Sequence, residues 1–333
     1  MTLTRRVDDR KLGRLVRLGA EEARRSGEGE AISRWVTADE NPIYLRRLVY
    51  HVSGLLSLNG PPRHGFALLD AGGGSGLLSV IACLMGASRG IVIDTNRHLM
   101  DFLLAVAPRL APDVRVEGYL RDVASTGLPD ASVDVVLCNE ALSHMLDVER
   151  FLDEAGRVLR PGGRLVISDS NNETNPRVRR DRIKEWERFE RPAREGCEAG
   201  ELFIKRRDLI EARFPGIGAE TACEIATATF GMTGEQVMEA ASLWLRGDRR
   251  EVSRYDGTRC PIDPISNQCA DRLFRPYELG RRLNRHGMRA SVRAHFATVP
   301  PYRALNGLWG AMSPLTLHLS RAFRIVAVKE MSA

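Results

Sequence analysis

Three glycines at alternate positions mark the part of the chain whose residues are best suited to chemistry. Gly72, Gly74 and Gly76 follow an apolar run that ends at Asp70, and a helix-like apolar run begins at Leu77. Glycine adopts positive φ without strain and has no Cβ, so such a loop turns sharply and lets the backbone approach a ligand closely. A carboxylate beside the loop suits a ligand that carries positive charge better than it suits a diphosphate. The pattern therefore predicts a site for a cationic nucleotide at the end of a buried strand.

The spacing separates this loop from the dinucleotide-binding fingerprint. That fingerprint, G-x-G-x-x-G, requires a third glycine where this chain has Leu77. The stretch from Asp70 to Gly76, an acidic residue followed by G-x-G-x-G, resembles motif I of the class I S-adenosylmethionine-dependent methyltransferases. The resemblance implies S-adenosylmethionine as the cofactor, with Asp70 and the three glycines in its binding site. A tight strand-to-helix turn that binds no ligand is the alternative.

A second acidic residue ends the next expected strand. Residues 90–94 form a short apolar run that closes in Asp94, and an acid about 20 residues past the glycines is the usual partner of a ribose. A carboxylate there can accept hydrogen bonds from both ribose hydroxyls. We therefore assign Asp94 to the cofactor; capping of the helix expected over residues 97–107 is an alternative compatible with that role.

The resemblance continues through the third and fourth strands. Asp122 precedes a Leu-Pro turn at residues 128–129, and an apolar strand over residues 133–138 follows. The resemblance implies that Asp122 accepts a hydrogen bond from the exocyclic amine of adenine, while the amide of Val123 donates to a ring nitrogen. Asn139, which follows the fourth strand, is assigned to the same cofactor site.

Two candidate bases follow this strand, at the edge where open α/β sheets place ligands and reacting groups. Histidine has an ordinary pKa of about 6.5, so its side chain can take a proton from a hydroxyl near neutral pH. We name His144 as the first candidate catalytic base and Glu140 as the second. Support of the loop is the alternative role for His144, and a charge at a helix N-terminus is the alternative for Glu140.

The elements that position these residues alternate between strand and helix, which predicts an α/β fold with a doubly wound, mostly parallel sheet. An amphipathic helix over residues 151–159 leads through Arg-Pro-Gly-Gly at 160–163 into a fifth strand over 164–169, and this turn also resembles the family. Two late strands are expected over residues 290–299 and 322–328. The resemblance covers residues 66–170 and implies seven strands, the last inserted antiparallel, with helices on both faces.

The chain is expected to contain four parts. They are an N-terminal helical arm and cap (1–60), a cofactor-binding core (61–170), a helical insertion that forms a substrate lid (171–275), and a C-terminal completion of the core sheet (276–333).

The arm and the insertion carry open alternatives. We expect residues 1–30 to form a basic helix packed loosely on the body. A second helix over 43–57 implies that Tyr44 or Arg46 could contact the ligand, although packing explains both residues nearly as well. Aromatic side chains in the insertion could stack on a flat acceptor or form the insertion's own core. They are Trp186, Phe203, Phe230, Trp244 and Tyr255.

Composition sets the outer limits. The 333 residues are 43% hydrophobic and 28% charged, which is typical of a soluble globular protein. We find no stretch as apolar as a membrane span and no leader pattern, so we expect a cytoplasmic protein. The net charge of +6 comes from arginines interspersed with acids, so we do not expect a nucleic-acid partner. The six cysteines lack zinc-site spacing, and we expect reduced thiols and no metal. A homodimer is left open.

These patterns predict a small-molecule type of S-adenosylmethionine-dependent methyltransferase. Its acceptor would be a hydroxyl, amine or activated carbon of a small molecule or of a lipid or sugar-type metabolite. An RNA methyltransferase is one alternative, although Asn139 is not followed by the Pro-Pro-aromatic loop used on exocyclic base amines. A non-catalytic module that binds S-adenosylmethionine is another, and an NAD-dependent dehydrogenase is the weakest.

Overall fold

The computed structural model describes residues 3–26, 29–193, 197–248, 260–296, 306, 309–310 and 312–331. The chain divides into two compact units, each described here by itself. The first unit comprises residues 1–142, 147–170 and 276–333, and the second comprises 143–146 and 171–275.

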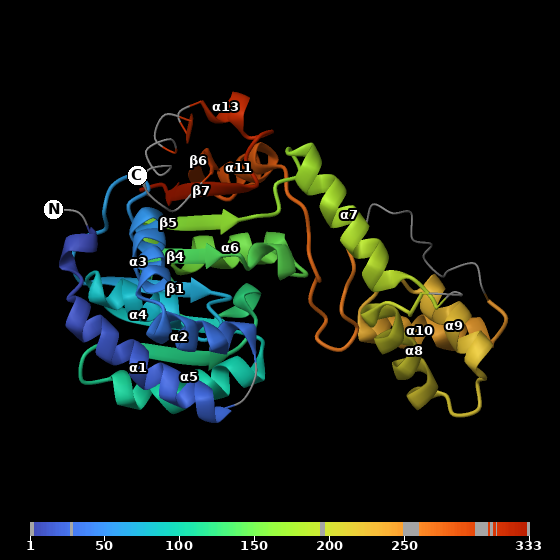
Figure 1. The fold of residues 1–333 in the computed structure, drawn as a ribbon. Helices are drawn as coiled ribbons and strands as arrows, with labels where there is room; N and C mark the ends of the chain where they lie inside the picture. The colour runs from blue at the N-terminus through green and yellow to red at the C-terminus, as the bar shows by residue number, and fades with distance from the viewer. Residues whose placement is uncertain are drawn as a thin grey trace. The chain divides into compact units, whose positions relative to one another are not determined.

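The first unit is built on a seven-stranded sheet with the order β3-β2-β1-β4-β5-β7-β6 (Figure 1). The pairs among β1 to β5 are parallel, whereas β7 runs antiparallel to both β5 and β6. The strands are β1 (Phe66–Ala71), β2 (Ala87–Asp94), β3 (Val116–Leu120), β4 (Val133–Asn139), β5 (Leu159–Asp169), β6 (Met288–His295) and β7 (Ala322–Lys329). The prediction of a doubly wound, mostly parallel sheet with an inserted antiparallel strand is confirmed.

Helices cover this sheet because its central strands are apolar on both faces. Every residue of β1 is buried, as expected for a central parallel strand. Chain order reverses direction between β1 and β4, and ligands of open α/β sheets bind at the carboxyl ends of the strands beside such a point. The helices of this unit are α1 (Asp9–Ser26), α2 (Glu30–Glu40), α3 (Pro42–Leu56), α4 (Leu77–Leu84), α5 (Arg97–Leu110), α6 (Val148–Val158), α11 (Pro276–Arg285) and α13 (Ser313–Thr316).

The N-terminal helices are part of the core. Leu15 and Val16 of α1 are fully buried, so the expectation of a loosely packed arm is wrong. Helix α2 has no counterpart in the prediction. Its Trp35 is also fully buried, and a Cβ on Gly19 of α1 would lie 2.0 Å from a carbon of the indole ring. Only glycine lets α1 and α2 approach this closely, so the two helices form one packed layer.

Several strand boundaries differ from the predicted ones, and the third strand, expected around residues 114–116, runs over Val116–Leu120. Strand β5 begins at Leu159, before the predicted turn, and its register against β4 jumps from the Val133–Leu159 pair to the Val135–Arg164 pair. The Arg-Pro-Gly-Gly segment therefore forms an irregularity within the strand. At the other end of the chain, β6 stops at His295, and residues 297–299 of the predicted strand lie outside the described residues.

The second unit is helical in its described part. Its helices are α7 (Pro176–Glu190), α8 (Glu201–Arg213), α9 (Ala219–Ala228) and α10 (Gly234–Leu245). Phe203 and Ile210 of α8 pack with Ile225 of α9 in a separate apolar core. Beside it, the buried guanidinium of Arg206 forms an ion pair with Glu190 and donates to the Ala226 carbonyl at 3.1 Å.

The aromatic residues of the insertion belong mainly to this interior. Trp186, Phe203 and Phe230 are each at most 4% exposed, and Trp244 packs against the same core. Burial leaves the first three without a face for an acceptor, which favours the core alternative over stacking. Tyr255 lies outside the described residues. None of the helices in the described part is long and apolar enough to cross a membrane.

Candidate functional site

The glycine loop connects β1 to α4 in the conformation that its sequence predicts. Gly72, Gly74 and Gly76 have φ of 70°, 57° and 78°, in the left-handed region that favours glycine. The Gly72 amide donates to the Ile93 carbonyl at 2.8 Å. A Cβ on Gly72 would lie 2.5 Å from the Cβ of Ala141, so both backbone and packing require glycine there.

Two hydrogen bonds join helix α2 to the glycine loop. The indole Nε1 of Trp35 donates to Ser75 Oγ at 3.1 Å, and Ser75 Oγ donates to the Ala31 carbonyl at 2.7 Å. Ser75, which lies between Gly74 and Gly76, therefore joins the loop to α2. Sequence reasoning missed both residues, because the two partners of this hydrogen bond lie 40 residues apart.

Asp70 lies beneath the loop and not on its surface. Its side chain is 1% exposed and accepts a hydrogen bond from Ser79 Oγ of α4 at 2.8 Å. Burial, with the nearby negative charge of Asp94, raises the pKa of Asp70 to about 6. The structure thus places Asp70 where it supports the loop and adds negative potential, and direct contact with the cofactor stays a prediction.

Asp94 ends β2 and reaches the glycine loop. Its Oδ2 accepts a hydrogen bond from the Gly74 amide at 3.0 Å, and its Oδ1 accepts one from the Asn96 amide at 2.9 Å. Capping of α5 belongs to Asn96, whose side chain accepts from the Leu99 amide. Each carboxylate oxygen retains a further lone pair for a ligand hydroxyl. Asp94 is therefore held beside the loop. Its binding of the ribose stays a prediction.

Asp122 and Val123 lie on the neighbouring segment, between β3 and β4. The Arg121 amide donates to the Asp94 carbonyl at 3.1 Å, which joins this segment to β2. The exposed Asp122 accepts from the Ala124 amide at 2.8 Å and begins a single 3₁₀ turn over Val123–Ser125. The assigned contacts of Asp122 and Val123 to adenine remain predictions.

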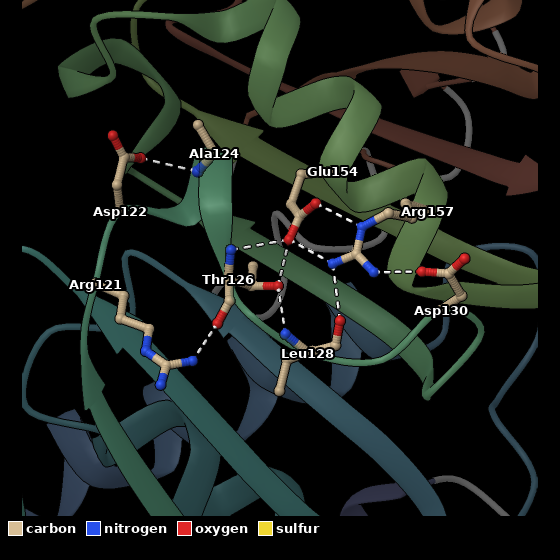
Figure 2. Close-up of polar contacts among 8 residues, drawn as sticks. All are labelled: Arg121, Asp122, Ala124, Thr126, Leu128, Asp130, Glu154 and Arg157. Atoms are coloured by element: carbon tan, nitrogen blue, oxygen red, sulfur yellow. Dashed lines mark hydrogen bonds and ion pairs between the residues drawn. The ribbon is translucent and has the colours of Figure 1, made fainter.

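A polar network fixes this segment from the side of α6 (Figure 2). Glu154 accepts hydrogen bonds from the amide and hydroxyl of Thr126, the former at 2.8 Å, and from Arg157 Nε at 2.8 Å. Arg157 also donates to the Leu128 carbonyl and pairs with Asp130. The Arg157 guanidinium and Thr126 lower the pKa of Glu154 to about 2, so this carboxylate is charged at neutral pH.

Asn139 closes β4 on the other side of the glycine loop. Its Oδ1 lies 2.7 Å from Nε2 of His51, a residue of α3. Nη2 of Arg324, from β7, lies 3.2 Å from Nδ1 of the same imidazole. Neither His51 nor Arg324 was predicted. A histidine on an expected amphipathic helix gave no signal, because its partners lie 88 and 273 residues away in sequence.

Glu140 follows directly and has a strained backbone, with φ of 52°. Its amide donates to the Ser168 carbonyl at 2.7 Å. Its carboxylate accepts hydrogen bonds from the Ser170 amide at 3.0 Å and the Ser170 hydroxyl at 2.7 Å. Glu140 therefore joins the ends of β4 and β5, and its catalytic role stays a prediction.

His144 belongs to the second unit. Its Nδ1 lies 3.1 Å from the Cys269 carbonyl, and the Cys269 amide donates to the His144 carbonyl at 3.0 Å. A carbonyl only accepts, so Nδ1 carries the hydrogen, and in the neutral ring Nε2 keeps its lone pair. This is the tautomer that a general base requires.

A pocket of about 210 Å³ lies beside His144 within the second unit. Phe189 and Leu202 give it an apolar side, while the carboxylates of Glu201 and Asp263 both pair with Lys205 nearby. The volume suits a small molecule or one end of a larger molecule.

The structure thus brings most predicted cofactor residues to one edge of one sheet. Asp94 contacts the glycine loop directly, the Asp122 segment is bonded to β2, and Ala141 of the Asn139 segment packs on Gly72. Of the two candidate bases, Glu140 lies in this first unit and His144 in the second.

Comparison with known proteins gives a match that covers the same region. Residues 69–167 match the family model described as a methyltransferase domain. A probable S-adenosylmethionine-dependent methyltransferase of Mycobacterium tuberculosis is 38% identical over 108 residues, which is 32% of this chain and 36% of that protein. The ubiquinone biosynthesis O-methyltransferase of Rhizobium johnstonii is 34% identical over 112 residues, or 33% of this chain and 43% of the relative.

A third relative is the 27-O-demethylrifamycin SV methyltransferase of Amycolatopsis mediterranei, 34% identical over 37% of this chain and 44% of its own length. The matched region therefore spans less than half of each of these relatives. Among solved structures, an S-adenosylmethionine-dependent methyltransferase of Methanosarcina mazei is 15% identical, with a TM-score of 0.45 over 81% of this chain and 95% of that one.

Proposed function

We propose, from the match of residues 69–167 to a methyltransferase domain, that this chain transfers a methyl group from S-adenosylmethionine to a small-molecule acceptor. The hydrogen bond from the Gly74 amide to the Asp94 carboxylate is the observation that carries the proposal, because it joins the two cofactor motifs at the switch point of the sheet.

The charges around the loop fit the cofactor. The negative charge of Asp94 adds to burial in raising the pKa of Asp70, and burial raises the pKa of the Cys138 thiol with further contributions from Asp169, Asp70 and Glu140. Such a concentration of negative potential is offset by a ligand with an ammonium and a sulfonium group. When bound, S-adenosylmethionine supplies an electrophilic methyl group.

The chain's own residues would position the cofactor and the acceptor, exclude water from both, and take the proton from the acceptor. Asp94 would hold the ribose, and Asp122 with the Val123 amide would hold the adenine. The acceptor must lie in line with the breaking bond between sulfur and methyl carbon, so alignment and exclusion of water are the main contributions of the protein. His144 would take the proton from the acceptor hydroxyl or amine at Nε2, since Nδ1–H is committed to the Cys269 carbonyl.

The acceptor is proposed to be a small molecule. The pocket beside His144 has the volume of a small ligand or part of one. One relative is named as a ubiquinone biosynthesis O-methyltransferase, and another as a 27-O-demethylrifamycin SV methyltransferase. A hydroxyl-bearing metabolite is therefore the first class of acceptor to screen, by release of S-adenosylhomocysteine.

Substitution of His144 by alanine tests the proton transfer once an acceptor is found. We expect kcat at saturating cofactor to fall by about 10²- to 10⁴-fold for a hydroxyl acceptor, with unchanged affinity for S-adenosylmethionine. Higher pH should partly restore the rate, because the acceptor then loses its proton without help. His98→Ala, an exposed histidine on α5, is the matched control. An H144A variant with wild-type kcat would show that His144 only supports its loop.

A further inference from the structure

Three side chains from three elements contact one another in turn at the end of β4. Arg324 of β7, His51 of α3 and Asn139 of β4 are joined by contacts of 3.2 Å, from Nη2 to Nδ1, and 2.7 Å, from Nε2 to Oδ1. Arg324 is 8% exposed. Its position depends on Gly54, one turn further along α3, where a Cβ would lie 3.2 Å from Nη1.

The chemistry of the three groups fixes the direction of both hydrogen bonds. A guanidinium has only donors, so Nδ1 of His51 must accept from Arg324. The hydrogen of the neutral ring then lies on Nε2, which donates to Asn139. The atom of Asn139 that faces His51 must therefore be the carbonyl oxygen, and the amide NH₂ group points away from the imidazole with two donors.

The two N–H donors of the Asn139 amide lie at the carboxyl end of β4, beside the glycine loop. Asp70 of β1 is in register with Leu137, so Asn139 lies level with the first glycine of the loop. Two residues further, Ala141 packs on Gly72. An asparagine here can turn either its oxygen or its NH₂ group toward a ligand, and only the second choice binds an acceptor atom.

We propose that Arg324 and His51 are positioning residues that hold the Asn139 amide with its NH₂ group toward the cofactor, as a donor to an oxygen of the bound molecule. The inference rests on the proposed function for the identity of that molecule. The orientation of the Asn139 amide follows from contacts within the first unit and does not depend on a bound ligand.

The surroundings keep His51 neutral, as the arrangement requires. Burial and the guanidinium of Arg324 lower the pKa of His51 to about 4. Among the described residues, His295 of β6 is a further titratable group coupled to this cluster, and burial, Arg324 and His51 lower its pKa to about 3. Protonation of His51 would place a hydrogen on Nδ1 opposite the guanidinium and break the chain of hydrogen bonds at Arg324.

The first test uses the wild-type chain without cofactor. In protein labelled with ¹⁵N-histidine, the His51 resonances, assigned by their loss in His51→Gln, should show a hydrogen on Nε2 and a lone pair on Nδ1. They should keep these shifts down to pH 5. A hydrogen on Nδ1, or a titration midpoint near the ordinary value of about 6.5, would overturn the proposal.

The second test is calorimetric titration with S-adenosylmethionine at pH 6 and pH 8. We expect H51L to weaken binding about fivefold at both pH values, the effect of one ordinary hydrogen bond, while H51Q retains a donor and stays within about twofold of wild type. R324M should weaken binding up to about fivefold at both pH values, because burial still keeps His51 neutral while the ring, without the guanidinium, can carry its hydrogen on Nδ1 and accept from the Asn139 NH₂ group.

Controls separate the positioning role from folding and from the cofactor assignment. R289M removes an exposed arginine from β6 of the same sheet and should leave binding unchanged at both pH values. Wild-type binding by both H51L and R324M would overturn the positioning role while leaving the proposed function intact. Absence of binding by the wild-type chain would contradict the proposed function, and with it the ligand assigned to Asn139. The tautomer measurement stands apart from both outcomes.

Discussion

At the scale of residues, one carboxylate organises the edge of the sheet where we propose that the cofactor binds. Asp94 accepts one hydrogen bond from the glycine loop and one from its own turn, so its two oxygens are fixed in space before any ligand binds. Such preorganisation lowers the entropic cost of binding, because the carboxylate loses no further freedom. The sequence position of Asp94 predicted its place beside the loop, but not the contact with Gly74.

Substitution of Asp94 by asparagine should weaken the binding of S-adenosylmethionine by about 1.5 to 3 kcal/mol, the range for hydrogen bonds to a charged group. The amide cannot accept from two hydroxyls through both of its terminal atoms. Titration calorimetry measures the change, and Asp101→Asn on the exposed side of α5 is the matched control. Unchanged affinity in D94N would mean that the ribose lies elsewhere.

Asp70 gives the second prediction at this scale, through the pH dependence of stability. Its folded pKa of about 6 lies above that of an unfolded aspartate, so folding favours the protonated form. The stability that this group contributes is therefore highest below about pH 4 and declines as pH rises toward 6. Asp70→Asn lacks this decline because its side chain does not titrate.

We expect the difference in unfolding free energy between D70N and wild type to shift in favour of D70N by roughly 2 kcal/mol between pH 4 and pH 6. It should be constant above about pH 7. Urea unfolding at closely spaced pH values measures this difference. Asp101→Asn should give a flat difference, and a flat difference in D70N as well would show that Asp70 has an ordinary pKa in the folded protein.

At the scale of elements, the segment after β3 is held by α6. Glu154 accepts from Thr126 and from Arg157, and Arg157 reaches the Leu128 carbonyl, so a helix side chain pair fixes both ends of the segment that carries Asp122 (Figure 2). The predicted Leu-Pro turn thus has a partner that sequence alone did not indicate.

Replacing Glu154 by glutamine should lower the unfolding free energy by about 2 kcal/mol at pH 7, because the side chain loses the charge that its partly buried hydrogen bonds stabilise. The folded pKa of about 2 lies below the ordinary value, so the stability from Glu154 is present above pH 4.5 and is lost as pH falls toward 2. The E154Q deficit should therefore shrink below about pH 4.

Urea unfolding tests this prediction, with Glu149→Gln as the control. Glu149 lies on the same helix, but its ion pairs are at the surface, so we expect a loss below about 1 kcal/mol. If E154Q and E149Q lose equal stability, the network does not hold the segment.

Sequence reasoning predicted the elements of the sheet better than those around it. Alternating apolar runs and glycine turns are local signals, and they predicted a strand near each of the seven, with the third displaced toward the N-terminus, and the residues of α4. Helix α2 was missed because its apolar side depends on Trp35 packing over Gly19, a contact between distant positions. Helices α8 and α9 were missed for a similar reason, since their apolar residues serve a core separate from the sheet.

The site shows the same division. The glycines and Asp94 are motif residues with fixed spacing, whereas Arg324, His51 and Trp35 act through partners far away in sequence. Burial of Asp70 beneath the loop also depends on tertiary contact with Ser79, so its position below the loop surface could not be predicted from the motif.

At the scale of the whole molecule, the chain joins a sheet unit with the cofactor residues to a helical unit that contains His144 and a pocket. The seven-stranded sheet supplies a common fold, and the second unit has its own core.

Titration of the purified chain with S-adenosylmethionine, and separately with NAD, tests whether the glycine loop and Asp94 bind the methyl donor. We expect micromolar binding of S-adenosylmethionine with one site per chain and no binding of NAD. We also expect thermal stabilisation by S-adenosylmethionine that grows with its concentration, since the ligand binds only the folded chain. Binding of NAD alone, or of neither molecule, would contradict the assignment of the glycine loop and Asp94 to the methyl donor.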